Sequence, residues 1–402
     1  ASGFSPSLSV SDLDGNTGFH LVGGSGRSVS IAGDINGDGF DDLIIGGSDL
    51  YPGRLRFDPG FSYVVFGKAS GFGASMDLPS VDGNTGFRLK LLTARTIVSN
   101  AGDVNGDGFD DLIISDGDSK DGRVGTSYVV FGKASGFSAT IDLASLDEGS
   151  GFRLVGVADG DVSGRSVSGA GDVNGDGFDD LIIGAYRSDN NGDNSGSSYV
   201  VFGDDFTNAI NFMGTPGDDM LIEGTIAAER FVAGTGNDWM TGGGGADVFH
   251  GGGGDDTVTV SGNDFQLVDG GAGNDTLVWV VGDLSLVSVR GKINDIETIN
   301  LTGVGNNTLT LTLTDLLNLS GTSNTLTVEG DVGDNVAGLG TDWISGGISN
   351  GYRIFTQGAA VLQIDASMSV DFPVPGIIDL SDLNGSNGFR IEGEEWGFSN
   401  FI

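Results

Sequence analysis

The chain has 402 residues, enough for two or three domains with separate cores. It carries 18 basic against 56 acidic residues, a formal net charge of −38, so it has no basic patch to meet nucleic acid or an anionic membrane surface. Cysteine is absent, which excludes disulfides and thiolate metal sites. No apolar run approaches the roughly 20 residues that span a bilayer, so we expect no membrane insertion.

An acidic loop recurs three times in the first half of the chain. GDINGDGFDDLIIG, starting at Gly33, returns nearly unaltered from Gly102 and from Gly171, at intervals of 69 residues. Each copy places oxygen-bearing side chains at loop positions 1, 3, 5 and 9 and a phenylalanine carbonyl at position 7. This alternation suits Ca²⁺, which takes six to eight oxygens at about 2.3–2.6 Å, better than Mg²⁺, which demands near-ideal octahedral geometry. The predicted ligands are Asp34, Asn36, Asp38, Phe40 and Asp42; Asp103, Asn105, Asp107, Phe109 and Asp111; and Asp172, Asn174, Asp176, Phe178 and Asp180.

The loop differs from the helix-flanked calcium loop at its end. Position 12 is Ile45 rather than a bidentate glutamate, and the apolar run Leu43–Ile45 predicts a strand. Three solvated acidic turns are the alternative, because Asp, Asn and Gly all favour turns. The same ligand positions in three copies favour metal binding.

The repeats resemble the FG-GAP repeats of integrin α-chain heads and of many bacterial surface proteins. Phe66-Gly67, Phe131-Gly132 and Phe202-Gly203 supply one half of that name, and Gly169–Gly171 supplies the other. Around each acidic loop the sequence places an ASGF segment, a GFRL-type strand, an SVS strand, an LII strand and SYVVFG. The resemblance covers residues 1–205 and implies three propeller-type repeats, each a four-stranded blade with calcium in its loop.

From Gly214 the period changes to nine residues. Five units align on an aspartate at position 6 and a large apolar residue at position 8; they are 214–222, 233–241, 242–250, 251–259 and 270–278. They resemble the calcium-binding nonapeptide of RTX proteins, which implies a parallel β-roll over residues 206–278. The predicted ligands are Asp219, Asp238, Asp247, Asp256 and Asp275.

Two features of the nonapeptide array stay open. Degenerate ten-residue units at 223–232 and 260–269 interrupt it, and some sites there are expected to be lost. A flexible glycine linker is the alternative to a roll, but the recurring apolar position argues against it.

Residues 279–375 alternate Thr with Leu or Val, as in Thr308–Thr314, and so predict strands that continue or cap the roll. The fold class expected for the whole chain is all-β: FG-GAP propeller-type blades, a parallel β-roll and a β-rich cap.

Residues 376–402 repeat the opening of an FG-GAP unit, since Ile378–Gly393 matches Ser9–Gly23. The next acidic loop would be due where the sequence stops, at Ile402. We expect either a processed piece of a larger array or strand donation between neighbouring chains, which would build a head-to-tail filament.

The sequence offers no catalytic constellation. The two histidines, His20 and His250, are not part of an H-E-x-x-H motif. Gly347–Gly351 spells G-x-S-x-G, but no histidine follows Ser349 to complete a triad. Because the clustered carboxylates are accounted for as calcium ligands, the chain is not expected to be an enzyme.

The two resemblances imply a secreted, calcium-stabilised structural or adhesive protein of a bacterial surface, exported by type I secretion. Self-association is the first expected partnership. A surface glycan or protein ligand bound through the variable loops is the second. The alternative functions are therefore a carbohydrate- or protein-binding propeller module and an accessory region of a secreted hydrolase.

Overall fold

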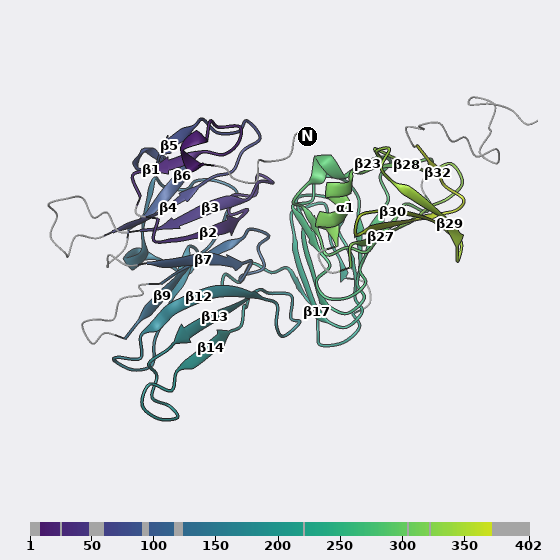
Figure 1. Ribbon diagram of the computed structural model, residues 1–402. Coiled ribbons are helices and arrows are strands. Elements are labelled where there is room, and N and C mark those ends of the chain that lie inside the picture. The colour runs from purple at the N-terminus through teal and green to yellow at the C-terminus, as the bar shows by residue number, and fades with distance from the viewer. Residues whose placement is uncertain are drawn as a thin grey trace, which may run out of the picture.

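The computed structural model describes residues 9–24, 26–47, 60–90, 96–115, 124–219, 222–303, 305–320 and 323–371. Nearly all regular elements in these ranges are strands, so the all-β prediction is confirmed (Figure 1). The α-helix α1 (Leu313–Leu319) has seven residues, and the described part of the chain contains no helix that could cross a membrane. Short 3₁₀ turns are η1 (Val10–Asp12), η2 (Leu78–Ser80), η3 (Leu143–Ser145) and η4 (Leu286–Val289).

The first half of the chain forms a row of blades (Figure 1). The first blade has the order β10-β6-β4-β3-β2, with β2 (Ser28–Gly33), β3 (Asp42–Gly46), β4 (Phe61–Val65), β6 (Gly86–Lys90) and β10 (Thr140–Asp142). The second has the order β11-β9-β8-β7, with β7 (Ile97–Gly102), β8 (Asp111–Ser115), β9 (Thr126–Val130) and β11 (Gly151–Val155). The third has the order β12-β13-β14, with β12 (Ser163–Gly171), β13 (Asp180–Ala185) and β14 (Ser197–Val201). A parallel pair, β1 (His20–Val22) and β5 (Ser75–Asp77), lies beside the first blade.

The first two blades take their fourth antiparallel strand from the following repeat. β6 contains the GFRL segment of the second repeat, yet it pairs with β4 of the first blade, with Val64 opposite Phe87. β11 joins β9 in the same way, with Val129 opposite Phe152. All four of these residues lie in the apolar interior of the blades or pack against it, so the exchange ties consecutive repeats through their cores.

The second half of the chain winds into a roll whose successive strands alternate between parallel sheets. We call the five-stranded sheet the docking sheet; it contains β15 (Phe212–Met213), β17 (Arg230–Thr235), β19 (Val248–Gly253), β21 (Leu267–Asp269) and β24 (Ile293–Asn294). We call the nine-stranded sheet the long sheet; in order it contains β16 (Ile222–Glu223), β18 (Trp239–Thr241), β20 (Thr257–Val260), β22 (Thr276–Trp279), β25 (Thr298–Asn300), β27 (Thr325–Glu329), β31 (Ala360–Asp365), β30 (Tyr352–Gln357) and β29 (Ile344–Ser349). A third sheet contains β23 (Leu284–Ser285), β26 (Thr308–Thr310), β28 (Asn335–Ala337) and β32 (Ser369–Val370).

The apolar position of each nonapeptide fills the interior of the roll. Met240, Phe249, Val258 and Leu277 are buried, whereas Leu221 lies outside the described residues. Phe231, from a degenerate unit, stacks on Phe249 with 4.8 Å between ring centroids. The recurring position 8 therefore builds one continuous apolar core, as a rolled sheet requires and a flexible linker would not.

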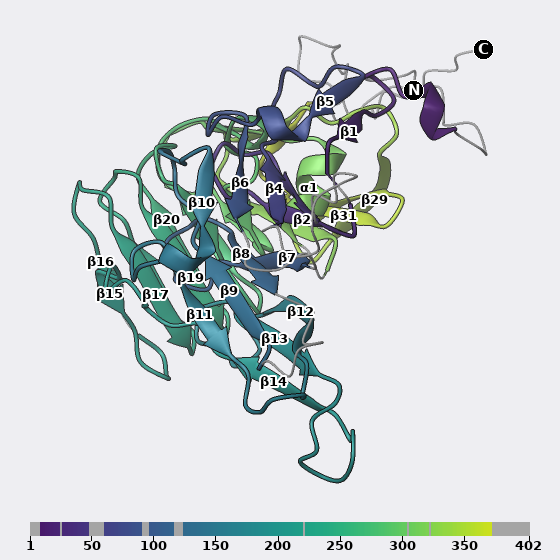
Figure 2. The ribbon, with the colours of Figure 1, turned by 90° about the vertical axis from the view of Figure 1, so that its left-hand side faces the viewer.

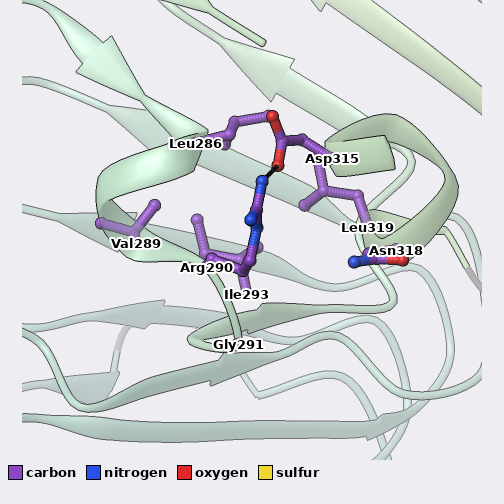
Figure 3. Close-up of a pocket in the computed structure, with 8 residues that line it drawn as sticks. All are labelled: Leu286, Val289, Arg290, Gly291, Ile293, Asp315, Asn318 and Leu319. Atoms are coloured by element: carbon purple, nitrogen blue, oxygen red, sulfur yellow. Dashed lines mark hydrogen bonds and ion pairs between the residues drawn. The ribbon is translucent and has the colours of Figure 1, made fainter. Parts of the chain in front are cut away.

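Residues after 278 add strands to the same sheets. β25, β27 and β31 extend the long sheet in parallel, and the antiparallel β29–β30 hairpin ends it. Just before β24, Arg290 forms an ion pair of 2.8 Å with Asp315 of α1 (Figure 3). The carboxylate of Asp315 also completes the capping box of α1 with Thr312. The domain boundaries expected after residues 205, 278 and 375 stay predictions, and residues 376–402 lie outside the described residues.

The docking sheet lies against the acidic loops of the blades, and Figure 2 shows strands of the roll behind those of the blades. The glycine at loop position 6 makes the approach possible. A Cβ added there would lie 3.1 Å from the Arg290 carbonyl at Gly39, 2.7 Å from a Val248 methyl at Gly108 and 2.8 Å from a Val232 methyl at Gly177. The three loops therefore contact three different turns of the roll at close range.

Gly108→Ala should weaken the docking of the roll on the second blade. The new methyl would press on Val248 and on the Gln266 amide, which is 2.8 Å from the Cβ position. Gly136→Ala is the matched control, because Gly136 has a similar φ of +79° but open space around its Cβ position. We expect the control to lose only the left-handed backbone strain, about 1–2 kcal/mol, and Gly108→Ala to lose more and to open the blade–roll contact to protease. Equal losses of thermal stability and equal proteolysis would contradict the contact.

Candidate metal centres

In each acidic loop the first carboxylate is wrapped by the loop's own backbone. Asp34 accepts the N–H of Asp38 at 3.0 Å and the N–H of Gly39 at 2.6 Å. The equivalent residues Asp103 and Asp172 accept the same pair of N–H groups in their own loops. The aspartate at loop position 5 continues the turn, since the carboxylates of Asp38, Asp107 and Asp176 accept the N–H of the phenylalanine two residues on.

The carboxylate at loop position 9 ties the loop to the Phe-Gly turn of the same repeat. Asp42, Asp111 and Asp180 begin β3, β8 and β13, and all three are completely buried. They accept the N–H of Gly67, Gly132 and Gly203 at 2.7, 2.9 and 3.0 Å. One hydrogen bond thus joins the acidic loop of each repeat to its Phe-Gly pair.

The first loop leaves an acceptor free for a cation. The second oxygen of Asp42 is buried and has no hydrogen-bond partner. Burial, and then the charges of Asp34 and Asp38, raise the pKa of Asp42 to about 8. In the second loop burial and the charge of Asp103 raise the pKa of Asp107 to about 7. A dication would reverse this balance, because it stabilises the ionised form of each carboxyl group.

Another aspartate, at loop position 8, bonds to the loop of the preceding blade. Asp110 accepts the N–H of Asp34, and Asp179 accepts the N–H of Asp103, each at 2.8 Å. These carboxylates lie so close to Gly33 and Gly102, both at positive φ, that an added Cβ would overlap them. Sequence reasoning missed this role, although the recurring Asp-Asp doublet was its signal.

The nonapeptide aspartates of the long sheet form a ladder across the turns of the roll. The N–H of Asp219 donates to Asp238 at 2.7 Å, that of Asp238 to Asp256 at 2.8 Å, and that of Asp256 to Asp275 at 2.8 Å. In Asp238, Asp256 and Asp275 the other carboxylate oxygen is buried without a hydrogen-bond partner. Each rung therefore satisfies one oxygen with the backbone and leaves one free.

Glycine turns bring backbone oxygens to these free acceptors. A Cβ added at Gly251 would lie 2.4 Å from the free oxygen of Asp256 and 2.4 Å from the Gly270 carbonyl. Burial, followed by the charges of Asp256 and Glu297, raises the pKa of Asp275 to about 8. Oxygen donors that converge beside a buried carboxylate fit Ca²⁺, which accepts carbonyl as well as carboxylate ligands.

Two residues that the nonapeptide pattern missed extend the ladders. Glu297 accepts the N–H of Asp275 at 2.9 Å, one turn beyond the last nonapeptide. On the side of the docking sheet, Asp247 accepts the N–H of Glu229 at 3.0 Å. Glu229 belongs to the degenerate unit 223–232, which therefore keeps a carboxylate despite its irregular spacing.

In the other degenerate unit, 260–269, the side chain of Gln266 points toward the blades. Strand register places Gln266 beside Asp247, because Val248 pairs with Leu267. The amide of Gln266 donates to the carbonyls of Asp107 and Gly108 in the second loop, both at 3.1 Å. In this unit Gln266 takes the place of the carboxylate, and its amide connects the roll to a blade.

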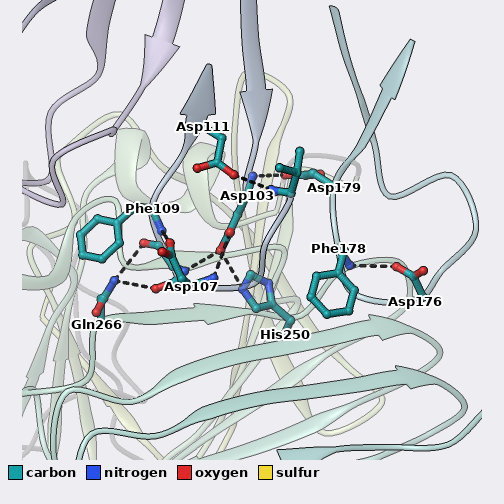
Figure 4. Close-up of polar contacts among 11 residues, drawn as sticks. Asp103, Asp107, Phe109, Asp111, Asp176, Phe178, Asp179, His250 and Gln266 are labelled. Atoms are coloured by element: carbon teal, nitrogen blue, oxygen red, sulfur yellow. Dashed lines mark hydrogen bonds and ion pairs between the residues drawn. The ribbon is translucent and has the colours of Figure 1, made fainter. Parts of the chain in front are cut away.

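His250 makes the second polar contact across this boundary (Figure 4). Its Nε2 lies 3.1 Å from the carboxylate of Asp103, and both side chains are buried. Burial lowers the pKa of His250, but the hydrogen bond and charge of Asp103, with the charges of Asp269 and Asp179, raise it to about 9. His250 ends the nonapeptide 242–250, a position that does not by itself reveal this partner.

Side-chain acids alone do not make up these centres. The described residues contain no group of three or more His, Asp or Glu side chains that could hold a metal ion by themselves. We expect asparagine side chains in the three loops, and backbone carbonyls in both kinds of site, to supply further oxygens.

Comparisons with known proteins agree with both repeat types. The FG-GAP repeat family matches residues 25–64 and 163–201, and the RTX calcium-binding nonapeptide repeat family matches residues 223–258 and 261–278. Integrin alpha-4 of Xenopus laevis is 28% identical over 163 residues, which cover 39% of this chain and 14% of that protein. Integrin alpha-V of Gallus gallus is 28% identical over 194 residues, which cover 45% of this chain and 16% of that protein.

The chain thus spans less than a fifth of the length of these integrins. Propeller-type blades with acidic loops, a parallel roll with carboxylate ladders and the two family matches lead to one assignment. The chain carries FG-GAP repeats together with RTX calcium-binding nonapeptide repeats, and it binds several calcium ions.

Proposed function

We propose that this chain is a calcium-stabilised extracellular module with a structural or adhesive role and no catalytic activity of its own. The observation that carries the proposal is the set of buried carboxylate oxygens without partners in Asp42, Asp238, Asp256 and Asp275. A buried unpaired charge is strongly destabilising, so a fold that keeps four such atoms depends on a bound cation.

The proposed ligands are those predicted from the sequence, three loop sets and five nonapeptide aspartates. Glu229 and Glu297 join them because they occupy equivalent rungs of the ladders. Extracellular calcium suits this design, since its millimolar level can occupy sites that stay empty in the cytosol. The RTX repeats support export by type I secretion followed by folding outside the cell.

Other readings of the sequence have different support. The likeness to integrin α chains supports a ligand-binding role for the blades, for a protein or a surface glycan. Head-to-tail assembly through residues 376–402 stays a prediction, because that segment lies outside the described residues. No observation favours a hydrolase.

Calcium titration of the purified chain tests the proposal. In chelator at pH 8 we expect little β-structure by circular dichroism and an expanded particle by light scattering; added Ca²⁺ should produce a compact β-rich protein. Magnesium at equal concentration is the control and should do much less. A fully folded chain in chelator would contradict the proposal.

Asp256→Asn should lower calcium affinity while it preserves the ladder. The amide oxygen can still accept the N–H of Asp238, so the change removes the charge and one good ligand oxygen rather than the hydrogen bond. The neighbouring Asp255→Asn is the control, because Asp255 is exposed and is not a proposed ligand. We expect roughly a tenfold loss of affinity, about 1.4 kcal/mol, for Asp256→Asn by isothermal titration. Equal affinities for the two variants would reject Asp256 as a ligand.

The pH dependence of stability should have opposite signs with and without calcium. In the ion-free fold the pKa values of Asp42 and Asp275 are about 8, against 3.8 for an ordinary aspartate. A raised folded-state pKa stabilises the fold below pH 4, and this contribution is lost as pH rises toward 8. Calcium binding needs ionised carboxylates, so its contribution grows over the same range.

Thermal unfolding at pH 5 and pH 8 measures this difference. At pH 5, protonation of the buried acids should let part of the calcium-free protein fold and show a melting transition, and at pH 8 this transition should move to lower temperature or disappear. The stabilisation on adding Ca²⁺ should be larger at pH 8. Added NaCl screens exposed charges more than buried ones, so the trend should persist in high salt. Calcium-free stability that increases with pH would contradict the assignment of these buried acids.

A further inference from the structure

Within the described residues the third blade has three strands, without the fourth that completes the other two. β4 and β9 each pair on their outer side with a GFRL strand, whereas β14 pairs within the described residues only with β13. An open strand edge presents unpaired N–H and C=O groups and is a template for another strand.

Side chains of the third blade are correspondingly uncovered. Val64 and Val129 are 0% exposed, but the equivalent Val200 is 48% exposed. Phe202 is 54% exposed, against 7% and 5% for its counterparts in the Phe-Gly turns of the first two blades. The hydroxyl of Tyr199 in β14 is buried and has no partner. The exposure of Val200 belongs to the open outer face of the blade, because Ile182 in the central strand β13 is also 39% exposed. Phe202 reports the open edge itself, since Phe66 and Phe131 pack on the phenylalanine of the strand that completes their blade. The edge of β14 therefore has an uncovered aromatic side chain and a buried hydroxyl without a partner.

The chain begins a fourth repeat before it enters the roll. Phe206 packs on Phe152 of the second blade in a tilted arrangement with 4.6 Å between ring centroids, at the position where Phe137 stacks on Phe87 of the first blade at 4.7 Å. Phe206 thus takes the place of the aromatic residue of the ASGF segment. Six residues later the chain enters β15 and the roll.

The repeat sequence resumes after the roll. Ile378–Gly393 aligns without a gap on Ile141–Gly156, and both share I-D-L, a leucine three residues on, G-F-R and a final glycine. In the third repeat this stretch contains β10, η3 and β11, the strand that completes the second blade. The roll is thus inserted between the two halves of a fourth repeat.

We propose that Gly388–Glu392 of the same chain adds to β14 as the fourth antiparallel strand of the third blade. The register follows from the second blade, where Gly151 lies opposite Val130 and Val155 opposite Thr126. It places Gly388 opposite Val201 and Glu392 opposite Ser197.

The tether is long enough for the chain to supply its own strand. The long sheet takes six strand steps from β16 to β31, which at about 4.8 Å a step makes roughly 29 Å. The tether of about 17 residues from Asp371 to Gly388 reaches roughly 56 Å when extended at about 3.3 Å a residue. The extended tether exceeds the length of the roll by roughly 27 Å. That margin is left for the step from the first turn of the roll to β14, so the chain can supply the strand without a second copy.

A disulfide trap tests the assignment in the full chain, which has no cysteine of its own. Ser197→Cys with Glu392→Cys joins two expected partners, whose Cα separation of about 4.5–5.5 Å suits a disulfide. Ser198→Cys with Glu392→Cys is the control, because neighbouring side chains on a strand point to opposite faces. With Ca²⁺ present we expect an intrachain disulfide in the first variant, identified by peptide mapping, and little in the control.

Two outcomes would overturn the assignment. A disulfide between chains, seen as a covalent dimer, would mean that a second copy supplies the strand, as in the head-to-tail filament. Equal cross-linking of the two pairs would mean that the segment does not dock in this register. Neither outcome bears on calcium binding, which the titration above measures separately.

Hydrogen exchange gives a measurement that no cysteine substitution can disturb. Deletion of residues 376–402 should speed amide exchange in β14 and leave β4 and β9 unchanged, because only β14 loses a neighbour. Unchanged exchange in β14 would also overturn the proposal.

Discussion

The structure depends on carboxylates that are buried with only part of their hydrogen-bonding capacity satisfied by the backbone. In the loops the first aspartate is wrapped by N–H groups, and in the roll each rung accepts one N–H from the neighbouring turn. The backbone fixes where the carboxylate lies, and the remaining oxygen of Asp42 or Asp256 has no protein partner. A net charge of −38 adds to this requirement, since a compact fold brings the acids together. Cations thus do for this cysteine-free chain what disulfides do for many small secreted domains.

The acidic loops and the roll both contain buried carboxylates, and they are also in direct contact. Gln266 and His250 reach from the docking sheet to the backbone and to the first carboxylate of the second loop. Glycine at loop position 6 permits this approach, which a side chain would prevent. The shape of a loop therefore influences the surface on which the roll rests, and the loops proposed to bind calcium share one boundary with the RTX repeats.

Periodicity in the sequence predicted the blades and the roll because each repeat has to bury its own apolar positions. The turn glycines, the inward residues such as Phe249 and the carboxylate ladder all follow from local spacing. Contacts between repeats were beyond such reasoning. Asp110 bonds a residue 76 positions away, and His250 bonds one 147 positions away. Glu229 was missed for another reason: its unit has ten residues, but the strand pairing still brings it into register with Asp247.

The direction of the roll explains why the chain has so far to return. The third loop meets Val232 in β17, the second meets Val248 in β19, and the first meets the Arg290 carbonyl near the other end of the docking sheet. The roll consequently runs back along the blades, from the third toward the first, and ends away from the edge at which it began. A parallel roll always separates its two ends, because each turn adds a strand in the same direction. An insertion of this kind is compatible with the row of blades only if a tether as long as the roll follows it. The residues between Asp371 and the resumed repeat provide that length.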